Sequence, residues 1–543
     1  MTADPMHGEQ IERDDAHLRS LGITPELRRT LGFLSNFAIA FSFISVSTGS
    51  FGNFGVGIGL GGPASIFWSW ILVVGGQLLV ALVFAELASH YPVAGSIYQW
   101  SKRLSNRTLG WFTGWFYFWA QVVTVSAVAV IVGYVIAGFT GGGQEFLDSP
   151  SPLGVGNMHT FIALTALLVT TLINAFGVRL LSILNNIGVA TEILGMLVFA
   201  VVLLVFANHQ SPAVLFDMAG TDAAVNGNVL ATFALGMYMS IFILYGFDTA
   251  GTFGEETVDA SRQAPRGVIT SVLASGAVGI VFFLAVLLAI PDVGATIEEG
   301  LAGGFPIATI IATNLNTEIA AGITFGELYL LVILASVFVC TLAIQGAATR
   351  MMFSMGRDRQ LPLGGAWGHV NQRFRTPANA AIAVGILAAL PILVTGPYGG
   401  FVLSIAATGL IYLSYLLCNL GVLMARRSGW PRQKAWFNLG RWGMPVNILA
   451  IVYGAVIILN IALWNDPNLF GDFGGEGRAY WNPAINSFLQ WFGQPLEALP
   501  PWPLYETIVG TLLVIGAIYY ALAIRGRAAD VEPDLATGEA TIG

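Results

Sequence analysis

The stretch LYGFDTAGTFGEETVDASRQAPRG, residues 244–267, places glycine, hydroxyl and carboxyl side chains directly after an apolar run. Among them are Gly246, Asp248, Glu255 and Glu256. Glycine lowers helix stability by about 1 kcal/mol relative to alanine, so we expect a membrane helix to unwind here. Unwinding leaves peptide groups unpaired, which a membrane protein tolerates only where they are buried or line a cavity. Carbonyl groups at the end of a half-helix near 245–247 would suit an ammonium group.

A second interruption follows the apolar run that starts at Phe33. Its small and polar residues are Ser45, Ser47, Thr48, Gly49 and Ser50. A half-helix beginning near 49–51 would present free amides and the positive end of its dipole, which suit a carboxylate. The two interruptions together predict a site for a small zwitterion or an amine. The alternative is that the glycines only allow close packing between helices.

Four residues carry carboxyl groups whose roles the sequence leaves open. Glu192 lies inside the apolar segment NNIGVATEILGMLVFAVVLLVF, and an ionisable residue there is a functional candidate. We expect it either to exchange a proton or to be a hydrogen-bonded structural carboxyl group. Asp248 could contact a substrate ammonium or cap a half-helix that starts at Thr249. Glu255 and Glu256 lie close in sequence to two arginines, Arg262 and Arg266, and would form an inner gate or structural ion pairs.

The composition defines the class of protein that positions these residues. The chain has 543 residues, of which 55% are hydrophobic and 10% are charged, with a mean hydropathy of +0.73. A soluble domain has about 25% charged residues, so this is a polytopic membrane protein. We expect no nucleic-acid partner. The two cysteines, Cys340 and Cys418, fall in apolar segments and the six histidines show no ligand spacing, so we expect no disulfide framework, no metal site, no cofactor and no enzyme.

Twelve segments are long and apolar enough to cross a bilayer, for which about 20 residues are needed. We expect an all-α bundle, because backbone exposed to lipid must satisfy its own hydrogen bonds and no barrel strands are evident. The segments lie near residues 31–61, 64–89, 111–139, 159–176, 184–207, 229–258, 267–290, 326–353, 378–395, 398–425, 446–464 and 505–524.

The interruptions fall in the first and sixth segments, which is typical of an inverted repeat of five helices with paired discontinuous helices at the bilayer midplane. This divides the chain into a tail, a first repeat, a second repeat, a pair of extra helices and a second tail, with bounds 1–30, 31–207, 229–425, 446–524 and 525–543. With both tails in the cytosol, all of the 23 Lys and Arg residues except Arg478 fall on the cytosolic side. This agrees with the positive-inside rule.

Five motifs, in order and spacing, resemble one known family. They are LGITPELRR ahead of the first segment, GLGGPASIFWSW, AELASHYPVAGSIYQW, GFDTAGTFGEETVDASRQAPRGV, and MMFSMGRDRQLP followed by TPANAAI. The family is the amino acid-polyamine-organocation superfamily, and within it the amino acid/choline branch that includes γ-aminobutyrate and choline permeases. The resemblance covers roughly Leu18 to Arg525. It implies the inverted-repeat transporter fold, alternating access and a substrate held between the two interruptions.

The resemblance also assigns roles by position. It places substrate-binding turns at Ser47, Thr48, Gly49 and Ser50, and at Tyr245, Gly246, Phe247, Asp248 and Thr249. Several relatives carry a Lys or His linked to proton coupling six residues after an Asn-Asn pair, where this chain has Glu192. The acid in place of a base leaves H+ and Na+ both open as coupling ions. Many branch members have His where Thr252 stands, and Glu86 in the third motif joins Glu255 and Glu256 as a gate or structural residue.

The expected function is therefore secondary active import of a small amino acid or related amine across the plasma (inner) membrane, coupled to a proton. An exchanger, or a Na+-coupled carrier of choline-like or polyamine cations, is the alternative, and a transporter-derived receptor is a further one. The aromatic stretch 111–121 is expected to be mainly an interfacial belt, with Tyr117 and Trp119 as candidates to face the interior. The oligomeric state stays open.

Overall fold

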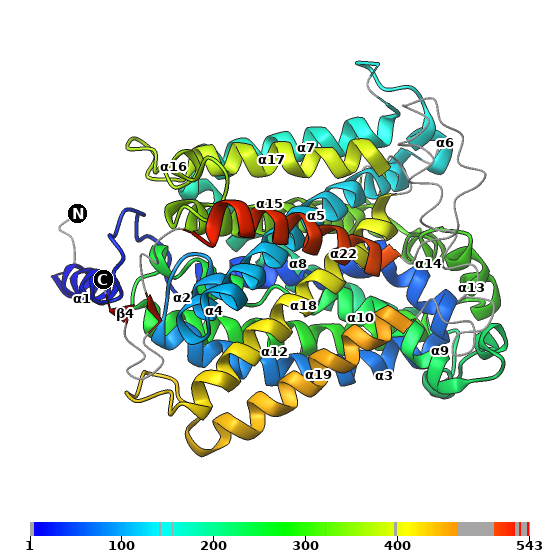
Figure 1. Cartoon of the computed structure of the whole chain (residues 1–543). Helices are drawn as coiled ribbons and strands as arrows, with labels where there is room; N and C mark the ends of the chain where they lie inside the picture. Colours follow the sequence, from blue (N-terminus) through cyan, green and yellow to red (C-terminus); the bar gives the residue numbers. More distant parts are fainter. Residues whose placement is uncertain are drawn as a thin grey trace.

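The computed structural model describes residues 5–140, 143–154, 156–320, 322–395, 399–463, 504–526, 532–533 and 540–541. Long helices lie side by side and run between two ends of one bundle (Figure 1). The short helices α1 (Pro5–Ser20), α4 (Ser96–Leu104) and α16 (Gly364–Trp367) lie at one end, which we call the α4 end. The opposite, α13 end carries α6 (Gly143–Asp148), α13 (Val293–Leu301) and α14 (Pro306–Asn314).

The first five expected segments form five long elements. They are α2 (Phe33–Ile44), α3 (Val46–His90), α5 (Arg107–Thr140), α7 (Met158–Phe176) and α8 (Val178–Phe206). Helix α3 contains both the second half of the first segment and the whole second segment. The two parts meet at Gly62, which precedes Pro63. Gly62 has a φ of +67°, and the chain bends there. A side chain at Gly62 would collide with the backbone of Met218, so glycine is required at this bend.

The remaining segments follow the same order. The sixth is divided into α9 (Val229–Gly236), α10 (Tyr238–Ile243), α11 (Thr249–Thr252) and the 3-10 turn η3 (Gly254–Glu256). The others are α12 (Ala260–Leu288), α15 (Phe325–Arg357), α17 (Ala378–Thr395), α18 (Gly399–Arg427), α19 (Gly443–Leu463) and α22 (Leu504–Tyr519), which continues as the π-helix η6 (Tyr520–Ile524).

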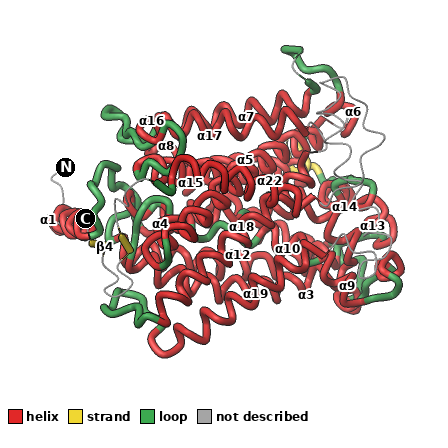
Figure 2. The backbone as a smooth tube through the Cα atoms, viewed as in Figure 1, coloured by secondary structure: helices red, strands yellow, loops and turns green. Residues whose placement is uncertain are grey.

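Regular structure outside these helices is short, as Figure 2 shows. Three 3-10 turns, η1 (Pro212–Phe216), η2 (Thr221–Val225) and η5 (Gly440–Trp442), lie in connections. Two antiparallel strand pairs join β1 (Glu318–Ala320) to β2 (Ile323–Thr324) and β3 (Glu532–Pro533) to β4 (Ala540–Thr541).

The chain is a multi-pass membrane protein. Within the described residues, nine helices are long and apolar enough to cross a membrane. One of them, Phe33–His90, contains two expected segments, and the shorter apolar helices Val229–Ile243 and Ala378–Val394 correspond to two more. This is consistent with twelve passes. The expected place of Arg478 and most of the second tail fall outside the described residues.

Packing between the two halves follows the order of the helices. Helix α5, the third of the first half, packs along α18, the last of the second half. Helix α8, the last of the first half, packs along α15, the third of the second half. This reciprocal arrangement is what an inverted repeat requires. It encloses α2 and α10, which lead into the two interruptions, within the bundle.

The aromatic stretch at the start of α5 differs from the expected interfacial belt. Trp111 and Trp115 are 2% and 6% exposed, and their rings pack against Tyr519 or Tyr520 at the end of α22. These rings therefore join α5 to the last helix of the chain rather than facing headgroups. Tyr117 is fully buried and faces the interior, as expected.

Candidate functional site

The first interruption lies at Ser45, between α2 and α3. Ser45 has a φ of +35°, and its N–H donates to the carbonyl oxygen of Phe41 at 2.8 Å, which ends α2. Helix α3 begins at Val46, so the expected start near 49–51 was wrong. The reason is that the small polar run is already helical: Gly49 N–H donates to Ser45 at 3.1 Å, and the Ser50 hydroxyl to Val46 at 2.6 Å.

Glu192 contacts this interruption directly. It lies midway along α8, is fully buried, and its Oε1 accepts the hydroxyl of Ser45 at 2.9 Å. The same oxygen accepts both the backbone N–H of Ser47 at 3.1 Å and its hydroxyl at 2.9 Å. The other carboxyl oxygen, Oε2, has no hydrogen-bond partner among the residues that the structure describes. Glu192 therefore occupies the positive N-terminus of α3, where a substrate carboxylate was expected.

The remaining candidates of the first interruption have local partners. The Thr48 hydroxyl forms a hydrogen bond with the Ser45 hydroxyl, with the two oxygens 2.6 Å apart. Gly49 lies so close to α10 that an added Cβ would collide with Ile243. Close packing, the alternative weighed for the glycines, is therefore what Gly49 provides here, while the interruption itself depends on Ser45.

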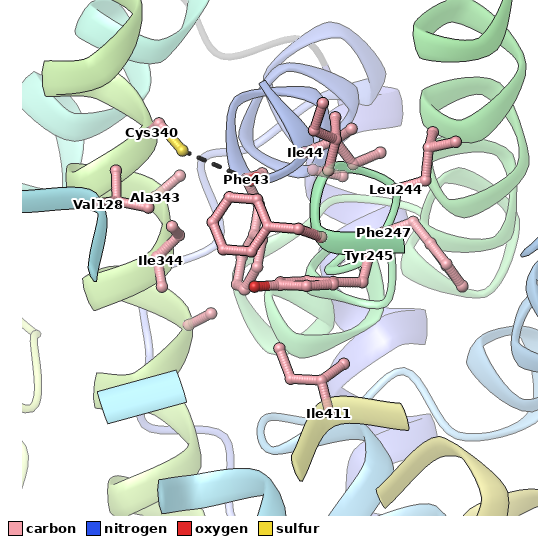
Figure 3. Packing of buried hydrophobic residues seen from close by; sticks show 14 of the residues in the cluster. Phe43, Ile44, Val128, Leu244, Tyr245, Phe247, Cys340, Ala343, Ile344 and Ile411 are labelled. Atoms are coloured by element: carbon pink, nitrogen blue, oxygen red, sulfur yellow. Dashed lines mark hydrogen bonds between the residues drawn. The ribbon is translucent and has the colours of Figure 1, made fainter. Parts of the chain in front are cut away.

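The second interruption spans 244–248, between α10 and α11. Gly246 has a φ of +89°, and its N–H donates to the Tyr415 hydroxyl of α18 at 2.9 Å. A Cβ at Gly246 would collide with the ring of Phe43, which precedes the first interruption. The rings of Phe43 and Tyr245 pack edge to face, with centroids 6.3 Å apart (Figure 3). The fold thus brings both predicted interruptions into contact at the centre of the bundle.

Asp248 neither caps α11 nor is open to a ligand in this conformation. Its backbone has helical angles and its side chain makes no capping hydrogen bond, so the capping interpretation was wrong. Instead the carboxyl oxygens accept the Tyr117 hydroxyl at 2.6 and 2.8 Å, the Tyr415 hydroxyl at 2.7 Å and the Ser96 hydroxyl at 2.9 Å. Three helices outside this segment therefore hold Asp248.

The neighbours of Asp248 are buried but differ in hydrogen bonding. Phe247 and Thr249 are both 0% exposed, and Tyr245 is 2% exposed. Within the described residues, the hydroxyl group of Thr249 has no hydrogen-bond partner. Because an unpaired buried hydroxyl costs about 1–3 kcal/mol, the Thr249 hydroxyl is a candidate to bind a ligand.

The candidate gate residues form buried ion pairs near the α4 end, but with other partners than expected. Glu256 pairs with Arg350 of α15 at 2.7 and 3.0 Å, and Glu255 pairs with Arg357 at 3.0 and 3.1 Å. Arg262 and Arg266 instead stack on Trp436. Glu86 of α3 pairs with Arg426 at the end of α18.

An aromatic cluster covers the interruptions from the α13 end. Phe305, between α13 and α14, stacks on Phe51 of α3 with centroids 5.9 Å apart and lies 4.3 Å from the ring of Tyr134 in α5. The aromatic cluster thus lies toward the α13 end, and the ion pairs lie toward the α4 end.

Sequence reasoning missed Ser96 and Tyr415 as partners of Asp248. They lie 152 and 167 residues from it in the chain, and hydroxyl residues are common in helices, so neither stands out. Tyr117 was predicted only as a candidate to face the interior, and not as a partner of Asp248. Its signal was a polar aromatic residue in the middle of an apolar helix.

Comparisons with known proteins agree on one family. Residues 31–481 match the family model described as "Amino acid permease". The amino-acid permease BAT1 of Arabidopsis thaliana is 30% identical over 83% of this chain and 89% of its own length. Its homolog from Oryza sativa subsp. japonica is 31% identical over 85% and 90%.

More distant similarities extend to other substrates and to a solved structure. The thiamine transporter thi9 of Schizosaccharomyces pombe is 23% identical over 84% of this chain and 81% of its own length. The crystal structure of MhsT in complex with L-phenylalanine superimposes with a TM-score of 0.52 at 15% identity, covering 78% of this chain and 98% of MhsT. At that identity the similarity concerns the fold alone.

Proposed function

The chain belongs to the amino acid permease family, and from this we propose that it imports a small amino acid or related amine by proton symport with alternating access. Family membership makes it a secondary transporter of amino acids and not an enzyme. The substrate, the proton and the inward direction across the plasma membrane, with both termini in the cytosol, are our proposals.

One observation carries the proposed coupling: Glu192 accepts the N–H and hydroxyl of Ser47 at the N-terminus of α3. An ionised carboxyl group is stabilised there by the helix dipole and by charge-assisted hydrogen bonds. A substrate carboxylate would need the same donors. Glu192 in its ionised form and the substrate therefore compete for one place.

Protonation of Glu192 would remove this competition. A neutral carboxyl group is a weaker acceptor, so the amide and hydroxyl of Ser47 would become available to the substrate carboxylate. Proton binding would then raise substrate affinity, and by thermodynamic linkage substrate binding would raise proton affinity equally. This reciprocity is the condition for symport. The substrate ammonium would bind the carbonyl groups that end α10, next to the unpaired hydroxyl of Thr249.

A cation carrier is the second candidate, supported by the similarity to the thiamine transporter. Glu192 Oε2 has no partner and the Ser45 hydroxyl lies beside the same carboxyl group. Carboxylate and hydroxyl oxygens could bind Na+ as well as a proton. A choline-like substrate would need no carboxylate site, and Glu192 would then face the cation itself.

Uptake into proteoliposomes tests the proposal. The purified chain would be reconstituted and offered amino acids, γ-aminobutyrate, polyamines, choline and thiamine under separate H+ and Na+ gradients. We expect accumulation of a small amino acid or amine driven by an inward H+ gradient. Accumulation driven only by Na+ would overturn proton symport, and exchange without net accumulation would favour an exchanger.

Glu192→Gln tests the coupling residue. The amide mimics a neutral carboxyl group, so we expect substrate binding and counterflow exchange to persist while proton-driven accumulation is lost. Binding should also no longer depend on pH. The matched control is Glu298→Gln, because Glu298 is an exposed carboxyl group of α13. Normal proton-driven uptake by Glu192→Gln would reject this role.

A further inference from the structure

The connection between α18 and α19 lies at the α4 end (Figure 1). It carries an exposed basic surface. Its sequence from Arg426 is RRSGWPRQKAWFNLGRW, and no acidic residue occurs from there through residue 465. Arg426 is buried against Glu86. The four other cations, Arg427, Arg432, Lys434 and Arg441, are exposed, and in the part of the chain that the structure describes none of them pairs with a carboxylate.

Two exposed tryptophans lie among these cations. Trp436 is 49% exposed and Trp442 is 59% exposed. The guanidinium of Arg441 lies 5.5 Å from the ring of Trp442, and those of Arg262 and Arg266 lie 5.8 and 5.4 Å from Trp436. Tryptophan is enriched where membrane helices leave the hydrocarbon, and α19 begins at Gly443. The surface therefore lies at the level of lipid headgroups.

Hydrogen bonds to the end of α3 also hold the connection in place. Glu86, fully buried at the end of α3, accepts the backbone N–H of Leu439 at 3.0 Å while it pairs with Arg426. The backbone N–H of Phe437 donates to Ser89 at 3.0 Å. These contacts order the backbone before any ligand binds, which lowers the entropic cost of binding.

We propose that this surface binds the phosphate groups of anionic phospholipids in the leaflet at the α4 end. Clusters of about four to eight Lys and Arg beside a membrane helix attract anionic headgroups, and the tryptophans anchor such a cluster at the interface. Because Glu86 connects the surface to α3, which carries the first interruption, bound lipid would stabilise the contact between α3 and α18. The inference does not depend on the transported substrate.

The test compares vesicles of phosphatidylcholine with vesicles that also contain phosphatidylglycerol. We expect phosphatidylglycerol to raise the thermal unfolding midpoint of the full chain and to remain bound in native mass spectrometry. The double variant Arg432→Gln/Lys434→Gln should lose several-fold of the retained lipid and most of the shift. Added salt should weaken the effect, because the Debye length is about 10 Å at 0.1 M.

A matched control removes two other exposed cations. Arg373 and Arg375 precede α17, so Arg373→Gln/Arg375→Gln makes the same charge change away from this surface. We expect it to keep both the shift and the bound lipid. Equal losses in the two double variants, no loss in either, or the same shift from inorganic phosphate in phosphatidylcholine vesicles would overturn the proposal.

Discussion

Glu192 and Asp248 are both fully buried carboxyl groups at the two interruptions, yet their surroundings differ. Both oxygens of Asp248 accept hydroxyl groups from α4, α5 and α18. Glu192 uses one oxygen and leaves the other unpaired. A carboxylate with every acceptor satisfied is suited to a permanent position, whereas one with an unpaired oxygen is suited to gaining a proton. We therefore propose a positioning role for Asp248 and proton exchange for Glu192.

This assignment predicts the effect of removing one donor from Asp248. Tyr117→Phe should lower the free energy of unfolding by about 1.5–3 kcal/mol, because hydrogen bonds to charged groups contribute that much. The control is Tyr453→Phe, whose hydroxyl faces only a neutral partner, Tyr412, at 3.3 Å. It should cost about 0.5–1.5 kcal/mol. Denaturant titration in detergent measures both, and equal losses would contradict a charged Asp248.

At the scale of elements, the interruptions could be predicted because glycine and serine stand out against apolar sequence. Their bounds could not, because serine hydroxyls can bond to the preceding turn and continue a helix, as Ser50 does.

The ion-pair partners were also missed. Arg262 and Arg266 lie near Glu255 and Glu256 in sequence, but Arg350 and Arg357 reach these carboxylates from α15. Sequence proximity therefore suggested the wrong partners, because α15 packs against this segment although it is distant in sequence.

The contact between the interruptions predicts a sharp difference between two glycines. Gly246→Ala would force a Cβ into Phe43 at a φ of +89°, so we expect loss of substrate binding and lower stability. Gly75→Ala, in the exposed part of α3, meets nothing within 4 Å and should be neutral or stabilising by up to about 1 kcal/mol. Binding and thermal unfolding measure both. If Gly246→Ala bound substrate as the wild type does, the substrate site would not depend on this contact.

Asp358, which follows α15, predicts a pH dependence of stability at the α4 end. Burial opposes its ionisation, but Lys102 and Arg357 outweigh burial and hold its pKa below the ordinary value of 3.8. A lowered folded-state pKa stabilises the fold above pH 3.8, and this contribution is lost as the pH falls through the folded-state pKa. The difference in unfolding midpoint between the wild type and Asp358→Asn should therefore be largest at neutral pH and shrink below pH 3.8. A constant difference would contradict this.

At the scale of the whole molecule, the five ion pairs of the described residues all lie toward the α4 end. Three of them join α3 or the sixth segment to α15 or α18. The fold class and the two interruptions followed from composition, from the length of the apolar segments and from the glycine and serine residues that interrupt them. Which ion pairs close the α4 end did not, because ion pairs across more than 90 residues depend on how the repeats pack.

This closure can be tested with a native cysteine. Cys418 of α18 is fully buried and faces Ser101 of α4. In a Cys340→Ser background, Glu255→Gln removes one partner of Arg357, which should favour opening of the α4 end and raise the rate of alkylation by N-ethylmaleimide. A tenfold rise corresponds to about 1.4 kcal/mol of lost closure. Glu298→Gln should leave the rate unchanged, and an unaltered unfolding midpoint must accompany the rise. If Glu255→Gln leaves Cys418 as protected as in the parent, the Glu255–Arg357 pair does not hold the α4 end closed.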